Sequence, residues 1–164
     1  MMASGCCGMP YRGLFKLVIL GGVGAVVVMG QSLRIVPSKA TGDTSGPFTV
    51  MLELSPGKEP VALQWEFAVS PVVAIRKTDI EIGRTAKLAG KSLTCVAKAS
   101  NPGSQVCVLA GGQKVLGAGP IAVIKCRARA HTHREPIRVA IQNALGVSVD
   151  LKRIDIRGVD SVIQ

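Results

Sequence analysis

Residues 61–69, with the sequence Val-Ala-Leu-Gln-Trp-Glu-Phe-Ala-Val, alternate between large apolar side chains and small or polar ones. A period of two residues is typical of a β-strand that buries one of its faces. The apolar face would include Trp65 and Phe67, and we therefore expect Trp65, the only Trp of the chain, to be a core residue. The opposite face, with Gln64 and Glu66, is predicted to meet water or a partner.

The same alternation recurs in short segments over the rest of the chain, separated by turn residues such as Gly and Pro. We expect further strands or strand pieces at residues 48–54, 72–75, 79–82, 93–97, 105–109, 121–130, 137–141, 145–149 and 154–156. A turn at Gln142–Asn143 would divide two of them, and residues 84–91 would form a loop. Eight to ten short strands in about 110 residues, with few helix signals, predict an all-β fold, and a β-sandwich accounts best for their number and spacing.

The amino-terminal segment differs in composition from the rest. Basic residues precede a run of about 13 apolar residues, which is the layout of a secretory signal. Residues 1–30 are therefore predicted to be a signal peptide, cleaved between Gly30 and Gln31. The run is shorter than the roughly 20 residues of a transmembrane helix, and a signal-anchor over residues 14–30 is the alternative. This segment, if uncleaved, is the only membrane contact that we expect.

The segments that follow differ in their content of apolar residues. Residues 31–47 are predicted to be a polar linker, because they include a Gly-containing stretch with nothing to bury. The folded domain would then extend over residues 48–158. Residues 159–164 are predicted to be a carboxy-terminal tail.

Three of the five cysteines lie outside the predicted signal, at Cys95, Cys107 and Cys126. The sequence Asn-Pro-Gly at 101–103 predicts a turn, so that the apolar runs around Cys95 and Cys107 form a hairpin with the two cysteines opposite each other. In an oxidising compartment this arrangement predicts a disulfide, and two buried free thiols are the alternative. Cys126 alternates with other small or apolar residues, which indicates a core position rather than a reactive thiol.

The formal net charge of +10 is compatible with an anionic partner. The candidate binding face is a basic stripe at alternate positions, made by Lys125, Arg127, Arg129 and His131. The alternative is a solvated strand face whose like charges discourage unwanted strand pairing. Binding of nucleic acid, or of glycans by aromatic stacking, is not expected, because aromatic residues make up only 3% of the chain.

No motif in the sequence indicates catalysis or a cofactor. His131 and His133 would share one face of a strand, but a metal site needs further ligands at matching spacing, and none is visible. Gly90-Lys91-Ser92 matches the end of a phosphate-binding loop but lacks the earlier Gly and the following helix. The 10 acidic residues are scattered along the chain. We therefore expect no enzymatic activity, no metal and no cofactor.

The strand segments follow one another in a recognisable order: Phe-Thr-Val-Met-Leu-Glu-Leu, Val-Ala-Leu-Gln-Trp-Glu-Phe, Ala-Gly-Lys-Ser-Leu-Thr-Cys, Val-Cys-Val-Leu-Ala-Gly, Gly-Pro-Ile-Ala-Val-Ile-Lys-Cys-Arg-Ala and Pro-Ile-Arg-Val. This order, over about residues 48–156, resembles a bacterial cohesin-like domain, in particular the small exported forms with a cysteine pair in a hairpin. The resemblance implies a jelly-roll sandwich of about nine antiparallel strands, related to carbohydrate-binding modules. Ser70-Pro71 stands where the family often has Asp-Pro.

The best-known members of that family bind dockerin partners in cellulose-degrading assemblies. The resemblance therefore implies a non-catalytic, exported binding module at the cell envelope or outside the cell, with a dockerin-like protein or a polysaccharide as its partner. The alternative is a structural or assembly β-sandwich of the cell envelope that has no soluble ligand.

Overall fold

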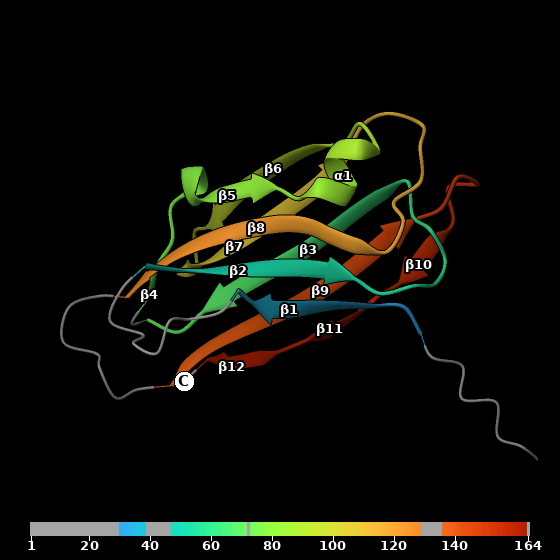
Figure 1. The fold of residues 1–164 in the computed structure, drawn as a ribbon. Helices are drawn as coiled ribbons and strands as arrows, with labels where there is room; N and C mark the ends of the chain where they lie inside the picture. Colours follow the sequence, from blue (N-terminus) through green and yellow to red (C-terminus); the bar gives the residue numbers. More distant parts are fainter. Residues whose placement is uncertain (1–29, 39–46, 72, 129–135, 164) are drawn as a thin grey trace, which may run out of the picture.

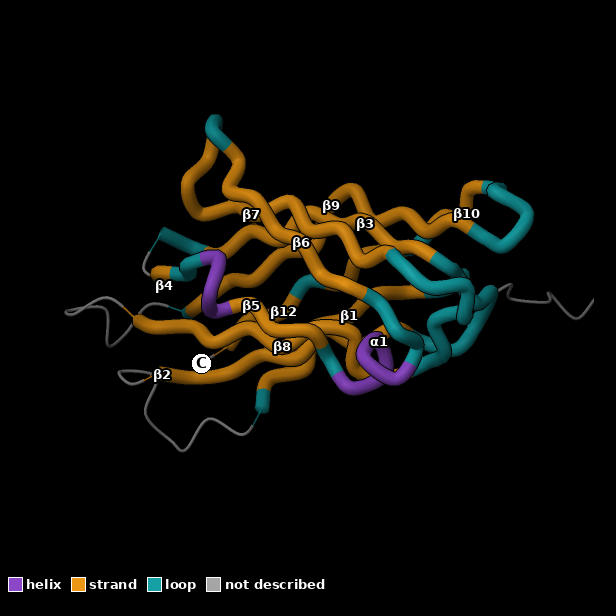
Figure 2. The backbone as a smooth tube through the Cα atoms, turned by 90° about the horizontal axis from the view of Figure 1, so that it is seen from above, coloured by secondary structure: helices purple, strands orange, loops and turns teal. Residues whose placement is uncertain are grey.

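The structure, a computed structural model, describes residues 30–38, 47–71, 73–128 and 136–163. This part of the chain forms two six-stranded β-sheets, called sheet A and sheet B here. Figures 1 and 2 show them as two layers that pack face to face. The predicted all-β sandwich is therefore confirmed, and almost all of its strand pairs are antiparallel.

Sheet A has the strand order β11-β1-β2-β8-β4, and β5 also pairs with β8. Its strands are β1 (Ser32–Pro37), β2 (Pro47–Leu54), β4 (Val73–Ala74), β5 (Ile80–Ile82), β8 (Gly119–Ala128) and β11 (Arg157–Val159). The carboxy-terminal part of the chain returns beside β1, and the pair that β1 forms with β11 is parallel.

Sheet B has the strand order β10-β9-β3-β7-β6, and β12 also pairs with β9. Its strands are β3 (Ala62–Val69), β6 (Ser92–Lys98), β7 (Asn101–Ala110), β9 (Ile137–Val147), β10 (Arg153–Asp155) and β12 (Ser161–Ile163). Two short helical segments, the 3-10 helix η1 (Lys77–Asp79) and the helix α1 (Arg84–Leu88), lie between strands. No helix in the described part of the chain is both long and apolar enough to cross a membrane.

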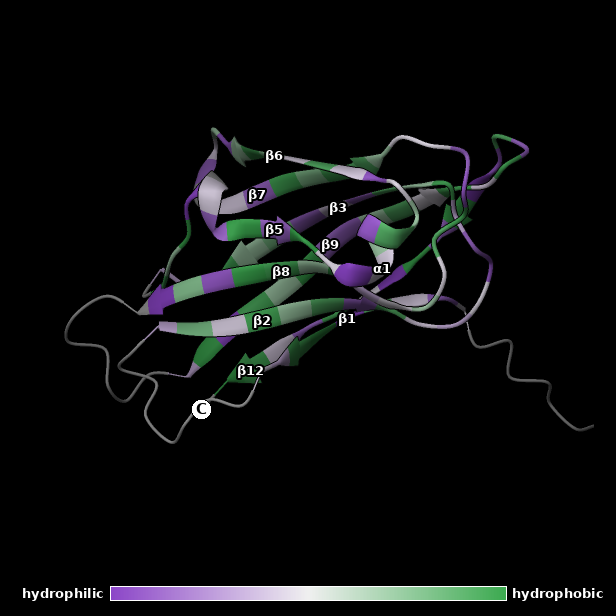
Figure 3. Ribbon diagram, turned by 45° about the horizontal axis from the view of Figure 1, so that its top comes forward, coloured by the Kyte–Doolittle hydropathy of each residue, from purple (hydrophilic) through white to green (hydrophobic). Residues whose placement is uncertain are grey.

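The core lies between the two sheets and takes one side chain from every second strand position. Figure 3 shows the resulting alternation of hydrophobic and hydrophilic residues along β2 and β8. Trp65 and Phe67 of β3 are completely buried, as the sequence pattern predicts. Cys126 of β8 is also buried, and this burial, together with the charge of Asp79, raises the pKa of its thiol to about 12. Such a thiol is protonated at neutral pH, which agrees with a core role.

Two of the predicted domain boundaries are wrong. Within the predicted linker 31–47, residues Ser32–Pro37 form strand β1, and its side chains Leu33 and Ile35 belong to the core. Within the predicted tail 159–164, residues Ser161–Ile163 form strand β12, which pairs with β9. In both cases the strand is short, so the local pattern was too weak to identify it.

The region around Asn143 is not a turn between two strands, because β9 continues through it. Glu66 of β3 lies opposite Gln142, and Gln64 lies opposite Leu145, so that β9 has one residue more than β3 in this interval. This is a β-bulge, and Asn143 takes a positive φ of 50° there, a conformation that Asn tolerates better than most residues. A bulge interrupts the alternation of apolar residues just as a turn does.

The predicted loop 84–91 contains the short helix α1. Ala86 of this helix is completely buried and belongs to the core, and α1 lies against β8. The helix is only one turn and a half long, so it carries no periodic pattern that the sequence could reveal.

Gly158 of β11 lies where the backbones of the two layers come close together. A Cβ atom added to this glycine would overlap the carbonyl oxygen of Ile141 in β9, which is backbone and cannot turn away. We therefore expect Gly158→Ala to lower the free energy of unfolding by about 1–3 kcal/mol, as overpacking does. Denaturant unfolding measures this effect. Gly117→Ala, at a glycine whose added Cβ would meet nothing within 4 Å among the described residues, is the control, and equal effects of the two variants would contradict the close approach.

Candidate functional site

The outer side of sheet B carries a group of residues from three adjacent strands, β3, β7 and β6. We call this group the B face and define it by Gln64, Glu66, Thr94, Val96, Val106 and Val108. The strand register places them in two rows, one with Thr94, Val108 and Gln64, and one with Val96, Val106 and Glu66. In Figure 2 no described helix covers this side of the sandwich.

The B face is partly apolar although it lies on the outside. Val96 is 55% exposed and Val108 is 39% exposed, while Val106 between them is half-buried. Single exposed valines are common on protein surfaces, but Val96 and Val108 are diagonal neighbours on adjacent strands, and together with Val106 they form the start of an apolar patch. Such a patch, with polar neighbours, is typical of a surface that contacts another molecule.

Glu66 lies on β3, at the end of the row with Val96 and Val106, and has an unexpected environment. The sequence pattern predicts it to face water, yet its side chain is only 8% exposed. Lys98 Nζ donates a hydrogen bond of 2.8 Å to Oε1, and Asn143 Nδ2 donates one of 3.1 Å to Oε2. Both carboxylate oxygens are thus bound, one by the end of β6 and the other by the bulge of β9.

These contacts change the acidity of Glu66. The hydrogen bond from Lys98 is the largest cause that lowers its pKa below the ordinary value of 4.5, and the hydrogen bond from Asn143 and the positive charge of Lys98 act in the same direction. Burial acts against them, because it disfavours the charged form. Since the net direction is downward, Glu66 is a charged and fully bound carboxylate at neutral pH.

Because the pKa of Glu66 is lower in the folded chain than its ordinary value, the carboxylate stabilises the fold above about pH 4.5. This stabilisation is lost as the pH falls through the lowered pKa. We therefore expect Glu66→Gln to show a smaller loss of stability on acidification than the parent chain, measured by denaturant unfolding at a series of pH values. Lys98→Met should raise the pKa of Glu66, as read from the carboxylate 13C shift, and Gln64→Ala is the control. An unchanged Glu66 titration in Lys98→Met would contradict the pairing.

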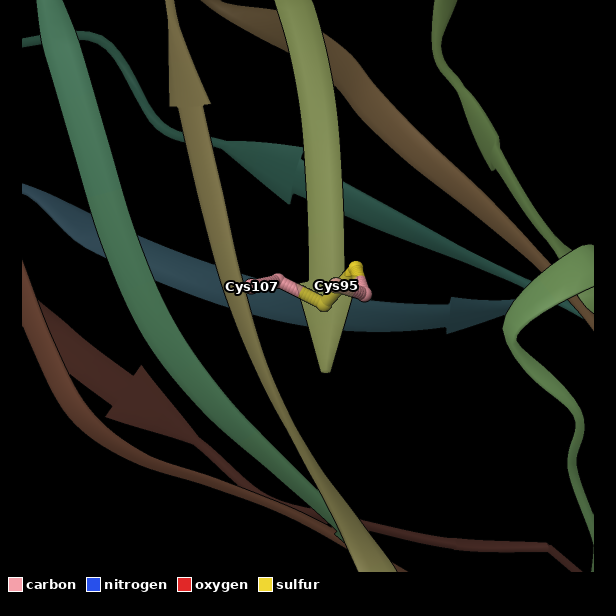
Figure 4. The surroundings of a disulfide bond; sticks show 2 residues. All are labelled: Cys95 and Cys107. Atoms are coloured by element: carbon pink, nitrogen blue, oxygen red, sulfur yellow. A yellow bond between two sulfur atoms is a disulfide. The ribbon is translucent and has the colours of Figure 1, made fainter. Parts of the chain in front are cut away.

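A disulfide joins the two strands that carry the valines of the B face. The structure contains the predicted bond between Cys95 of β6 and Cys107 of β7 (Figure 4). The two cysteines lie directly opposite each other in the strand register, and both side chains are buried on the inner side of sheet B. The bond therefore fixes β6, which is an edge strand among the described residues, to its neighbour β7.

The predicted basic stripe lies on the other sheet, and only part of it falls within the described residues. Lys125 and Arg127 project from the outer side of β8 in sheet A, as the alternation predicts. Each has an acidic neighbour: Lys125 is paired with Glu81, and Arg127 lies 3.8 Å from Asp79. Positive charge on this part of β8 is thus largely balanced, which fits a solvated strand face better than an anion-binding one.

Arg129 and His131, the other two members of the stripe, lie outside the described residues, and the stripe as a whole stays a prediction. The pair His131 and His133, considered as metal ligands, also lies outside them. Within the described ranges no group of three or more His, Cys, Asp or Glu side chains could hold a metal ion.

The sequence matches no known protein-family model and no curated protein. The structure does resemble solved structures. A non-cellulosomal cohesin from the hyperthermophilic archaeon Archaeoglobus fulgidus has a TM-score of 0.64 at 11% identity, over 82% of this chain and 91% of that one. A type II cohesin domain from the cellulosome of Acetivibrio cellulolyticus has a TM-score of 0.64 at 12% identity, over 82% and 95% of the two chains.

A third similar structure contains a type I cohesin in a cohesin–dockerin complex from Clostridium thermocellum, with a TM-score of 0.63 at 11% identity, over 82% of this chain and 99% of that chain. The three matches show that this chain has a cohesin-like β-sandwich fold, as its strand order predicts. At these identities the likeness concerns the fold.

Proposed function

We propose that this chain is a non-catalytic binding module that holds a protein partner on the B face. The observation that carries the proposal is the exposed pair Val96 and Val108 beside a carboxylate whose hydrogen bonds are already satisfied. Such a face can lose its water at little cost, because Glu66 does not need solvent to stay charged. The outer face of sheet A around β8 instead carries the ion pairs of Lys125 and Arg127.

The likeness of the fold to cohesins supports a protein, rather than a small molecule, as the partner of the B face. Cohesin structures similar to this one include complexes with dockerins, so a dockerin-like protein is the first partner to test. A polysaccharide is a weaker candidate, because none of the six residues of the B face is aromatic and Trp65 is buried in the core.

The test introduces a photo-crosslinking amino acid at Val96, in cells that produce the chain. We expect a discrete protein to be captured there. The same replacement at Val159 is the control, since it is 40% exposed and lies on the outer side of sheet A. Equal capture at both positions, or none at either, would contradict the proposal and favour an assembly role without a soluble ligand.

With the crosslinking amino acid kept at Val96, Val108→Asp is then expected to abolish the capture, because it places a charge in the apolar part of the interface. The free energy of unfolding should change by less than about 1 kcal/mol, since the Val108 side chain is exposed. Val159→Asp is the matched control and should leave the capture unchanged. Loss of capture that accompanies unfolding would argue against a direct role of the valines.

We also propose that the module is exported, with residues 1–30 removed. The disulfide between Cys95 and Cys107 supports an oxidising compartment. Gln31 is fixed in the sandwich: it is buried, and its backbone oxygen accepts a hydrogen bond of 2.9 Å from Arg157 N. The intact mass of the chain from its producing cell should therefore correspond to a start at or close to Gln31. Recovery of only the full-length chain in the membrane fraction would instead support the signal-anchor.

A further inference from the structure

A pocket of about 300 Å³ lies where β3 ends and β7 begins, at one end of the sandwich. We call it the end pocket. Both sheets contribute to its wall, β4 from sheet A and the strands β3 and β7 from sheet B. The described residues that line it are Val69, Pro71, Val73, Ala74, Ile75, Asn101, Gly103 and Gln105. Its size is at the lower end of the range of small-molecule sites, which suits a compact ligand.

The side chains that form the wall are mostly aliphatic, and none of the described lining residues is charged. An ion would therefore have to leave water without a counter-charge, which is unfavourable. The polar side chains of the wall are two carboxamides. Asn101 Oδ1 accepts a hydrogen bond of 3.1 Å from Gly103 N, so its oxygen is already in use.

Gln105 is the unusual member of the wall. It lies opposite Phe67 in the strand register, on the inner side of sheet B, and only 4% of the residue is exposed. Its Oε1 is buried and has no hydrogen-bond partner among the residues that the structure describes. Buried carboxamides are normally hydrogen-bonded, because an unpaired one loses its contacts with water and gains nothing. The terminal torsion of a Gln side chain is broad, so the amide can turn either its oxygen or its nitrogen toward the pocket that it lines.

We propose that the end pocket binds a small neutral molecule with an apolar body and a carboxamide head, and that this head pairs with the Gln105 amide. A carboxamide matches Gln105 because each group has both a donor and an acceptor. The aliphatic wall formed by Val69, Val73 and Ile75 would cover the apolar body of the ligand. The end pocket shares no residue with the B face, so this site is independent of the proposed protein interface.

Three probes of similar size test the proposal: benzamide, benzoate and toluene. Their binding is followed by the NMR shifts of the methyl groups of Val69, Val73 and Ile75 in the full folded chain. We expect saturable shifts with benzamide and binding weaker by about tenfold or more for benzoate and toluene, because one brings an unpaired charge and the other leaves Gln105 without a partner.

Gln105→Met keeps the length of the side chain and removes its amide. We expect it to weaken benzamide binding by about tenfold and to leave toluene binding unchanged. Gln64→Met, on the B face, is the matched control and should change neither. If Gln105→Met does not fold, the comparison of the three probes on the parent chain decides alone.

No saturable shift with benzamide, equal binding of benzamide and toluene, or full benzamide binding by a folded Gln105→Met variant would each overturn the proposal. Val96→Asp should not alter benzamide binding. The proposal for the end pocket and the proposal for the B face can therefore be contradicted independently of each other.

Discussion

Trp65→Ala is expected to lower the free energy of unfolding by about 3–5 kcal/mol, which is comparable to the whole stability of a marginal domain. Trp65 is completely buried at the centre of sheet B, between Cys107 of β7 and the bulge of β9. Shortening the side chain would leave a large cavity that the two stiff neighbouring strands cannot close. Denaturant unfolding of the parent and variant chains measures the effect.

Trp65→Phe is a second and milder test at the same position. The indole Nε1 of Trp65 has no hydrogen-bond partner within the described ranges, so Phe removes an unsatisfied donor as well as some volume. We therefore expect this variant to be more stable than Trp65→Ala. Gln64→Ala, at the exposed neighbouring position, should cost less than about 1 kcal/mol. If the Trp65→Ala chain were well folded and had lost only the binding of its partner, Trp65 would instead be a binding residue.

The residues on the inner side of the sandwich could be predicted from the sequence. When only one face of a strand is buried, its apolar residues must all occupy alternate positions. Shifting the register of β3 by one residue would expose Trp65 and Phe67 together, and this large cost makes the alternation a dependable signal. The cysteine hairpin was predictable for a different reason. Its two strands are neighbours in the chain and are joined by a short turn, so the pairing of Cys95 with Cys107 follows from local sequence.

The environment of Glu66 could not be predicted in this way. Parity correctly places Glu66 on the outer side of sheet B, but its burial depends on two residues that lie 32 and 77 positions further along the chain, Lys98 and Asn143. Their approach depends on the order of the strands and on the bulge in β9. A break in alternation at Gln142–Asn143 is equally consistent with a turn and with a bulge, and only the pairing with β3 distinguishes them.

Strand β1 shows the same limit at the edge of the domain. Leu33 and Ile35 alternate with Ser32 and Arg34, but so short an alternation is not enough to separate a strand from a linker. The parallel pairing of β1 with β11, from the other end of the chain, supplies the information that the local segment lacks. Gly158 of β11 also depends on a segment outside its own strand, since its need for a small side chain comes from β9.

Removal of the disulfide between Cys95 and Cys107 is expected to lower the free energy of unfolding by about 3 kcal/mol, since the bond closes a loop with a sequence separation of 12 residues. The double variant Cys95→Ala/Cys107→Ala is preferable to a single one, because it leaves neither member of the pair as an unpaired thiol. Within the described part of the chain, β6 is at the edge of sheet B and pairs only with β7. We therefore expect its amides to lose more protection from hydrogen exchange than those of β3.

Cys126→Ala is the control for the loss of a buried sulfur atom without the loss of a cross-link. It should cost about 1 kcal/mol, the amount typical of a small core truncation, and should not change hydrogen exchange in β6 selectively. Peptide mapping of the parent chain without reducing agent should find Cys95 linked to Cys107. Free thiols at both positions in the chain from its producing cell, or a double variant as stable as the parent, would contradict the role of the disulfide. If the bond also fixes the valines of the B face, the double variant should lose crosslinking at Val96 under conditions where β3 and β9 stay protected from exchange, because β6 alone would be released.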